Sequence, residues 1–477
     1  MLDLCRSFFA HLDEQGVRYC HWKSNEHLDQ ALSGRTDLDI LVHPQDQSAL
    51  EDAILRYDIK LILSPANKQF PGLEDYLGFD QETGSFVHLH VHYRMVMGQK
   101  YIKNHHLPLE DLFFDNLIEK EGIKIPRPEL ELILLYIRGH IKADYESIIK
   151  HGIKGVVTDD YTAFPQDIES EFRHLIATSD MAEVEVLLEL TGLPIAFDRM
   201  STFCQRLVKN ELKFHQIFTE QRYLLKALSP YRRAKSTLIY LSYFMFFLDT
   251  FTIVNRFKVY KRKRLVGEGK VIAFIGADGS GKSTLTADIS KWLSWKLTTN
   301  NYYYGIPKSR TAGVFSILSR ALTKLNMKRL VHFSQSLFWL YVAKHRQKVS
   351  QATAYSKIDG ELALTDRFPL ENFWNMPEPM DGPRLLSESS GIHSLFSDRE
   401  RVMYRSLYYP DLLIVLQVDL DVLRTRKPDL PSLADHTLKA DAINGLDENL
   451  KNSCLIDANK SYEEVLIEVK RKIWSVL

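Results

Sequence analysis

Gly276-Ala-Asp-Gly-Ser-Gly-Lys-Ser-Thr284 is the stretch that decides the fold of the C-terminal half. It satisfies the full Gly-x-x-x-x-Gly-Lys-[Ser/Thr] pattern of a phosphate-binding loop. The apolar run 271–275 precedes it and predicts a buried strand, and a helical pattern follows over 284–295. A glycine-rich loop between a strand and a helix leaves backbone N–H groups free for phosphate oxygens, so this half is expected to bind a nucleoside triphosphate.

The loop pattern also predicts a role for individual side chains. Lys282 is expected to reach the β and γ phosphate oxygens, and Ser283 is expected to ligate Mg²⁺. ATP and Mg²⁺ are therefore the expected cofactors. The predicted ATP-binding residues are Gly276, Gly279, Ser280, Gly281, Lys282, Ser283 and Thr284.

Composition describes an ordinary globular protein. The 477 residues are 45% hydrophobic and 26% charged, which predicts two or three domains. Lys plus Arg and Asp plus Glu both number 61, so no nucleic-acid partner is expected. The 4 cysteines show no metal-binding or redox spacing, and the N-terminus shows no signal-peptide pattern, so a cytoplasmic location is expected.

The order of sequence patterns predicts an α/β protein with four segments. Helix and strand patterns alternate near the N-terminus, and a long stretch of helical spacing follows them. The expected segments are an α/β domain at 1–125, a helical extension at 126–226, a basic and aromatic linker helix at 227–266, and at 267–477 a domain with a parallel sheet flanked by helices.

The linker contains the most apolar window of the chain, 236–254, and basic residues flank this window over 232–264. Asp249 and several hydroxyl groups interrupt it, so it is not expected to span a membrane. A buried or dimer-forming helix is the first expectation. The alternative is an aromatic-rich helix that lies on an anionic membrane surface, at the inner face of the membrane.

Three further features accompany the phosphate-binding loop pattern, one inside the loop and two later in the chain. Asp278 sits inside the loop, the apolar run 362–365 ends in Asp366-Arg367-Phe368, and Pro410-Asp-Leu412 opens another strand pattern. In this order the features resemble thymidylate kinases and related nucleoside monophosphate kinases. The resemblance covers about residues 268–477.

This resemblance implies roles for several residues. Asp366 would hold metal or acceptor, Asp278 would face the acceptor, and Arg367 would clamp a phosphate. On the helix expected over 333–355, Arg346 would contact the acceptor. The cations implied as a lid over the transferring phosphoryl group are Arg424, Arg426 and Lys427.

The resemblance implies phosphoryl transfer from ATP to a small acceptor. A nucleoside monophosphate such as dTMP is the default acceptor. The proline-containing segment 371–401 departs from the family, which leaves a sugar or sugar phosphate of surface-polysaccharide metabolism open. The alternative is a nucleotide-gated switch that docks through 232–264.

In the N-terminal segment, Trp22-Lys-Ser24 and the later Asp37-Leu-Asp39 resemble the pattern of a minimal nucleotidyltransferase, over about residues 1–125. Strand alternation directs Asp37 and Asp39 to one face, where two carboxylates suit Mg²⁺. Lys23 would contact a triphosphate, with Ser24 beside it at the same site.

Active members of that family add a third carboxylate from a later strand. Here the strand pattern 85–93 carries His88, His90 and His92 on one face, and His88 takes the carboxylate's place. Imidazole is a poor ligand for Mg²⁺, so the domain is weakened in catalysis, uses a softer metal, or only binds a ligand. Zinc on the three histidines and a toxin or antitoxin activity are further alternatives.

Overall fold

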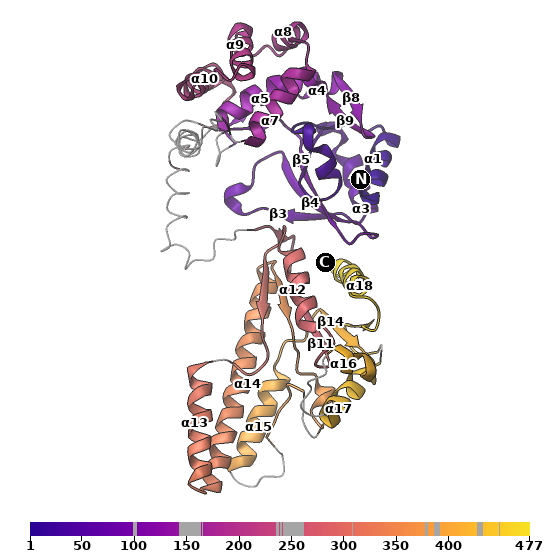
Figure 1. The fold of residues 1–477 in the computed structure, drawn as a ribbon, viewed down its shortest axis with the longest axis vertical. Helices are drawn as coiled ribbons and strands as arrows, with labels where there is room; N and C mark the ends of the chain where they lie inside the picture. Colours follow the sequence, from indigo (N-terminus) through magenta and orange to yellow (C-terminus); the bar gives the residue numbers. More distant parts are fainter. Residues whose placement is uncertain are drawn as a thin grey trace. The chain divides into compact units, whose positions relative to one another are not determined.

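The computed structural model of the chain forms two compact units, Met1–Tyr260 and Lys261–Leu477 (Figure 1). The structure describes residues 1–98, 103–142, 164, 166–234, 238, 241, 262–307, 309–376, 380–385, 392–426, 433–447 and 449–477.

Unit 2 is built on a parallel sheet with the strand order β12-β13-β11-β14-β15. Its strands are β11 (Lys270–Gly276), β12 (Thr299–Tyr302), β13 (Leu362–Thr365), β14 (Leu412–Gln417) and β15 (Ser453–Asp457). The central strand β11 is buried from Val271 to Ile275, as its apolar sequence predicts. Because the strands are parallel, their carboxyl ends share one edge, which is where open α/β sheets bind ligands.

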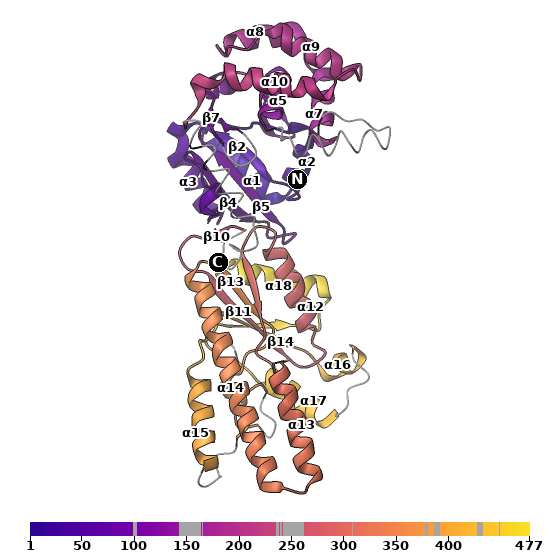
Figure 2. The same cartoon turned by 90° about the vertical axis from the view of Figure 1, so that its left-hand side faces the viewer.

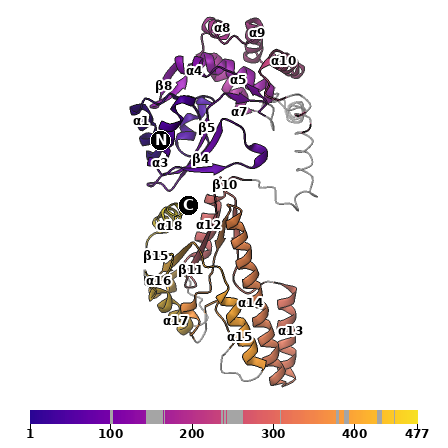
Figure 3. The same cartoon turned by 180° about the vertical axis from the view of Figure 1, so that it is seen from behind.

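Helices α12 (Lys282–Leu293) and α14 (Lys328–Ile358) pack on opposite faces of this sheet (Figure 2). The structure extends α14 beyond the range 333–355 expected from sequence, and α14 lies beside α13 and α15 (Figure 3). The other elements of unit 2 are β10 (Arg264–Leu265), α13 (Arg310–Lys324), a 3-10 turn at Glu371–Phe373, α15 (Ile392–Arg405), α16 (Leu420–Arg426), α17 (Leu433–Asn444) and α18 (Tyr462–Trp474).

Unit 1 contains a mixed sheet in which β1, β2, β5, β4 and β3 follow one another. Only β2 and β5 pair in parallel; the other neighbours are antiparallel. The strands of this sheet in unit 1 are β1 (Tyr19–His21), β2 (Leu38–Val42), β3 (Lys60–Leu63), β4 (Leu73–Phe79) and β5 (Phe86–His92). Two further pairs form separate sheets: β6 (Val96–Met97) with β7 (His105–His106), and β8 (Leu117–Lys120) with β9 (Ile123–Pro126). The helices are α1 (Asp3–Glu14), α2 (Leu28–Leu32), α3 (Gln47–Arg56), α4 (Glu110–Asp115), α5 (Pro128–Lys142), α7 (Gln166–Thr178), α8 (Met181–Leu190), α9 (Phe197–Val208) and α10 (Phe214–Ala227).

The helices of unit 1 share a core with its sheet. Helix α5 is buried along most of its length and packs in one apolar cluster with Trp22 and Met95. The Glu131 carboxylate accepts hydrogen bonds from the backbone N–H and side-chain amide of Asn25, both at 2.8 Å. The segment expected as a helical extension is therefore packed into the same hydrophobic core as the α/β segment.

The linker helix expected over 227–266 falls mainly outside the described residues, because most of the apolar window 236–254 is not described. Residues 227–234 complete α10 and a 3-10 turn at Ser229–Tyr231. Within the described ranges, no helix has both the length and the apolar character needed to cross a bilayer.

Candidate phosphoryl-transfer site

The phosphate-binding loop connects the end of β11 to the start of α12. Gly279 and Gly281 adopt φ values of 95° and 88°, a backbone region that side chains with a Cβ disfavour. At Gly276, a Cβ atom would lie 2.5 Å from Ser280 Oγ. The first turn of α12 places Ser283 and Thr284 at the surface, whereas Ser280 is buried. The glycines therefore allow the tight turn that exposes a helix N-terminus to a phosphate.

Lys282 lies folded back on the loop. Its Nζ donates hydrogen bonds to the carbonyl oxygens of Gly276 at 2.7 Å and Ala277 at 2.8 Å, and lies 4.0 Å from Asp278. Burial is the main reason that its pKa is lowered to about 8. A phosphate would replace two neutral carbonyl oxygens by charged oxygens, which favour the ammonium form.

Proton uptake should accompany ATP binding, and ATP affinity should fall as pH rises through about 8. Below this pH Lys282 is already charged, whereas above it the amine must gain a proton to pair with phosphate. Calorimetric titrations at pH 8 in buffers of different ionisation enthalpy should give an uptake approaching about half a proton. The matched variant Lys282→Arg keeps its charge, so any binding that it retains should lack this uptake. Equal proton uptake in both proteins would contradict the assignment.

Asp366 follows β13 directly and lies at the carboxyl edge of the sheet, beside the loop strand. Its Oδ1 is buried and has no hydrogen-bond partner. Burial raises the pKa of this carboxyl group, and Arg367 opposes that effect. An unsatisfied buried carboxylate oxygen beside a phosphate-binding loop suits an ion or its water shell. Together with exposed Ser283, Asp366 fits the residues expected to hold Mg²⁺.

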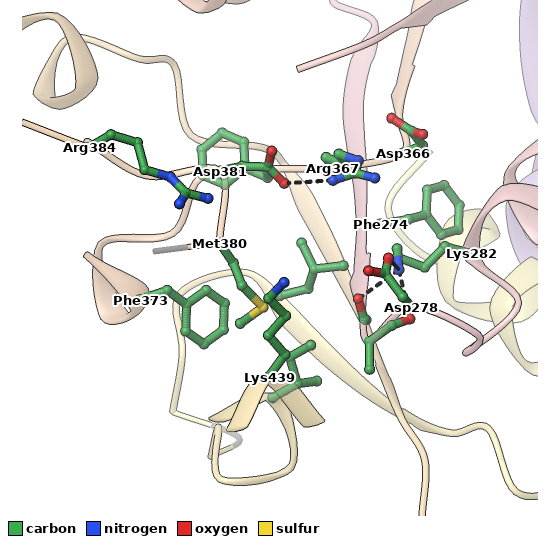
Figure 4. A pocket seen from close by; sticks show the side chains of 15 residues that line it. Phe274, Asp278, Lys282, Asp366, Arg367, Phe373, Met380, Asp381, Arg384 and Lys439 are labelled. Atoms are coloured by element: carbon green, nitrogen blue, oxygen red, sulfur yellow. Dashed lines mark hydrogen bonds and ion pairs between the residues drawn. The ribbon is translucent and has the colours of Figure 1, made fainter. Parts of the chain in front are cut away.

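A cavity of about 110 Å³ opens beside the loop (Figure 4). The residues expected from sequence that line it are Gly276, Asp278, Lys282, Asp366 and Arg367. The structure therefore brings the loop lysine and the Asp-Arg pair, which are about 85 residues apart in the chain, to one cavity. Residues of the cavity wall that sequence reasoning missed include Phe373, Met380, Asp381, Arg384 and Lys439.

Asp381 joins two arginines at this cavity. One carboxylate oxygen lies 3.0 Å from Arg346 Nη2, and the other lies 3.3 Å from Arg367 Nη1. Further along the same segment, residues 380–385, the buried Glu400 carboxylate accepts hydrogen bonds from two backbone N–H groups. The donors are Arg384 at 3.1 Å and Leu385 at 2.8 Å. Helices α14 and α15 therefore hold the described residues 380–385 in place as part of the cavity wall.

Arg346 was predicted to contact the acceptor, but the structure places its side chain inside the protein. It is only 2% exposed and is not a lining residue of the cavity. Its guanidinium donates to the Tyr304 carbonyl oxygen at 2.6 Å, to the Asp381 carboxylate and carbonyl, and to the Tyr404 hydroxyl. These contacts occupy the side chain within the protein, so Arg346 positions Asp381 and cannot reach an acceptor in this arrangement.

Arg346→Ala should destabilise unit 2 by about 3 kcal/mol, because it removes the buried donor to the Tyr304 carbonyl and leaves Asp381 with the more exposed Arg367 as its charged partner. Urea unfolding followed by a unit 2 tryptophan signal would measure the change. Arg329→Ala is the matched control, since Arg329 lies exposed on the same helix. A similar stability for both variants would contradict the positioning role.

Of the three cations expected in a lid, the two arginines lie on α16, and Lys427 lies outside the described residues. Both arginines are exposed, and Arg424 Nη1 pairs with Asp421 of the same helix at 3.2 Å. Neither Arg424 nor Arg426 is a lining residue of the cavity. In this structure the cation that lines the cavity from the same part of the chain is Lys439, on α17. The lid role of the two arginines stays a prediction.

In unit 1, the two predicted carboxylates each face a histidine of β5. Asp37 lies 2.9 Å from His88 Nδ1, and Asp39 lies 2.9 Å from His90 Nδ1. Lys23 Nζ lies 2.8 Å from Asp39. These contacts bring residues from three parts of the predicted nucleotidyltransferase pattern to one face of the sheet.

Ser24 is turned toward the helical part of unit 1. It has a left-handed φ of 58°, and its hydroxyl accepts a hydrogen bond from Arg138 Nη2 at 3.1 Å. Lys103 is a further cation near this site, and burial together with the charge of Lys23 lowers its pKa to about 7. A lysine whose charged form is disfavoured in this way is stabilised by an anionic ligand.

A carboxylate that sequence reasoning missed lies beside His88. Asp75 of β4 is 4% exposed, and its Oδ1 lies 3.2 Å from His88 Nε2. The antiparallel register pairs Asp75 with His90. A later strand therefore does bring an acid to this face, although His88 lies between Asp75 and Asp37.

No family model matches the chain. In Escherichia coli K12, the "Uncharacterized ATP-binding protein YghR" is 27% identical over 224 residues, which cover 43% of this chain and 86% of YghR. The "Uncharacterized ATP-binding protein YghS" of the same strain is 28% identical over 178 residues, which cover 34% of this chain and 74% of YghS. A solved thymidylate kinase from Candida albicans aligns with a TM-score of 0.27 and 15% identity, over 44% of this chain and 91% of the kinase. The chain is thus similar over part of its length to proteins named as ATP-binding, and unit 2 carries a phosphate-binding loop on a parallel α/β sheet.

Proposed function

We propose that the chain is an ATP- and Mg²⁺-dependent phosphotransferase that acts on a small acceptor at the cavity of unit 2. The observation that carries this proposal is the meeting of Lys282, Asp366 and Arg367 at one cavity beside the phosphate-binding loop. Similarity to proteins named as ATP-binding supports the nucleotide.

The reaction proposed is in-line transfer of the γ phosphoryl group of ATP. The loop N–H groups and Lys282 hold the triphosphate, while Ser283 and Asp366 hold Mg²⁺. Mg²⁺ held by these two residues would supply positive charge beside the phosphate oxygens. Arg367 faces the same cavity and stabilises the charge that spreads onto the transferring group, and Asp278 orients the acceptor.

The proposed acceptor carries a phosphate. Beyond Lys282, the cavity wall contains the cations Arg367, Arg384 and Lys439, which exceed what ATP binding at the loop requires. Phe368 and Phe373 add apolar surface of the kind that packs on a nucleobase. A nucleoside monophosphate such as dTMP therefore stays the first candidate, and a sugar phosphate is the alternative.

The deciding experiment incubates the full chain with γ-labelled ATP and Mg²⁺ against nucleoside monophosphates, sugars and sugar phosphates. Transfer of label to one class, lost in Lys282→Ala, supports the proposal. Nucleotide-dependent liposome binding with slow hydrolysis and no transfer would favour a nucleotide-gated switch instead.

We also propose that unit 1 carries a nucleotidyltransferase-like site at Asp37 and Asp39. Its support is the 2.8 Å contact of Lys23 Nζ with Asp39, because binding of a triphosphate would require a cation beside the acidic pair. Transfer from α-labelled triphosphates that is lost in the Asp37→Ala, Asp39→Ala double variant and kept in Lys282→Ala would assign a second activity to unit 1. Absence of such transfer would leave unit 1 as a ligand-binding domain.

A further inference from the structure

Three side chains of unit 1 converge between two parallel strands. β2 and β5 pair with Asp39 opposite His90, and His92 lies two residues further along β5 on the same face. Asp39 Oδ1 lies 2.9 Å from His90 Nδ1 and 3.6 Å from His92 Nε2. One ligand atom from each of the three residues lies within 4.8 Å of the other two. Two imidazole nitrogens and one carboxylate oxygen therefore surround a single point.

His92 is the member of this group that a purely structural role leaves unexplained. It is 0% exposed and packs against the Trp22 ring at 4.8 Å. Neither ring nitrogen makes a hydrogen bond, and the 3.6 Å to Asp39 is too long for one. A buried donor or acceptor without a partner is destabilising, whereas a metal ion would satisfy Nε2.

The other nitrogen of His90 faces a second carboxylate. His90 Nε2 lies 3.7 Å from Asp75 Oδ1, and the other Asp75 oxygen accepts a hydrogen bond from Ser64 Oγ at 2.6 Å. Histidine ligands commonly present their remaining nitrogen to a carboxylate, which orients the ring and raises its basicity. At 3.7 Å the two atoms are too far apart for a hydrogen bond, so Asp75 is a nearby carboxylate that would orient His90 only after a small shift of either side chain.

We propose that Asp39, His90 and His92 bind a divalent transition-metal ion. Two nitrogens and one oxygen suit Zn²⁺ or Co²⁺, whereas Mg²⁺ prefers oxygen ligands alone. Asp37 lies outside this set because it faces His88. The site therefore differs from a Mg²⁺ pair on the two aspartates, and it does not depend on phosphoryl transfer in unit 2.

Lys23 contacts the carboxylate oxygen that is proposed to bind the metal. Its Nζ lies 2.8 Å from Asp39 Oδ1. Its ammonium neutralises Asp39 when the metal is absent. When a metal neutralises Asp39, this cation becomes available to an anion that completes the coordination of the metal. The ligand class of the site is accordingly a phosphate or carboxylate anion.

Titration of the chelator-treated full chain with Co²⁺ tests the site directly, because bound Co²⁺ absorbs in the visible range. We expect one saturable site whose absorption disappears on addition of Zn²⁺ and persists in excess Mg²⁺. His92→Gln should abolish this absorption, and Asp75→Asn should weaken Co²⁺ binding by about 10- to 100-fold.

His140→Gln is the matched control. His140 is also 0% exposed, but it lies in the helical core, where Nδ1 contacts the Tyr136 carbonyl at 2.7 Å. It should retain the Co²⁺ spectrum if it remains folded by circular dichroism, as should Lys282→Ala. Absence of a saturable Co²⁺ site in the wild-type chain, or an unchanged spectrum in folded His92→Gln, would overturn the proposal.

Discussion

Lys282→Ala should lower the rate of phosphoryl transfer by about 10³-fold. The lysine is the cation that the loop presents to the β and γ phosphates, and its side chain already lines the cavity where Asp366 and Arg367 meet. Alanine removes the charge without disturbing the glycine turn.

Label transfer from γ-labelled ATP under single-turnover conditions measures this effect apart from product release. Lys291→Ala is the control, because Lys291 lies exposed on the same helix, α12. Its rate should match that of the wild-type chain. A Lys282→Ala rate within about threefold of wild type would place the reaction outside the loop.

The sheet and loop of unit 2 could be predicted because local sequence specifies them. The apolar run before Gly276 becomes β11, the glycines supply the positive φ angles, and the helix expected over 284–295 follows, although it starts two residues earlier, at Lys282. Strand order is different, because it depends on which strands pair across long connections. β11 pairs with β13 and β14, and no short segment of the sequence specifies this pairing.

The cavity wall was harder to predict than the loop. Asp381 and Lys439 come from segments without a recognisable motif, and only packing brings them to the loop. Arg346 shows the converse, since the resemblance to thymidylate kinases implied an acceptor contact, whereas burial and four hydrogen bonds to three residues hold it inside. A helix pattern in sequence gives the face of a side chain but not what the tertiary structure places against that face.

In unit 1, alternation along the strand predicted that His88, His90 and His92 share a face. Alternation did not show which carboxylate lies beside each histidine. The register between β2 and β5 sets His90 and His92 beside Asp39 and leaves His88 between Asp37 and Asp75. Register is a tertiary property, so Asp75 and the separate role of His92 appear only in the folded chain.

Asp366→Asn should lower the maximal transfer rate by about 10²-fold and raise the Mg²⁺ concentration needed for half-maximal rate. Asparagine keeps the size of the side chain and removes its charge. The buried Oδ1 of Asp366 has no protein partner that the substitution would break, so the fold should be preserved. Removal of the charge should then affect mainly Mg²⁺ binding and the transfer of the phosphoryl group.

Asp419→Asn is the matched control, because Asp419 lies beyond the end of the neighbouring strand β14, is exposed and is not a lining residue of the cavity. Rates measured across a Mg²⁺ series at saturating ATP and acceptor separate the two variants. If Asp366 instead orients the acceptor, Asp366→Asn will raise the acceptor KM and leave the Mg²⁺ dependence unchanged. A shift in Mg²⁺ dependence at constant acceptor KM therefore assigns the carboxylate to the metal, since only a metal contact links the charge of Asp366 to the Mg²⁺ concentration.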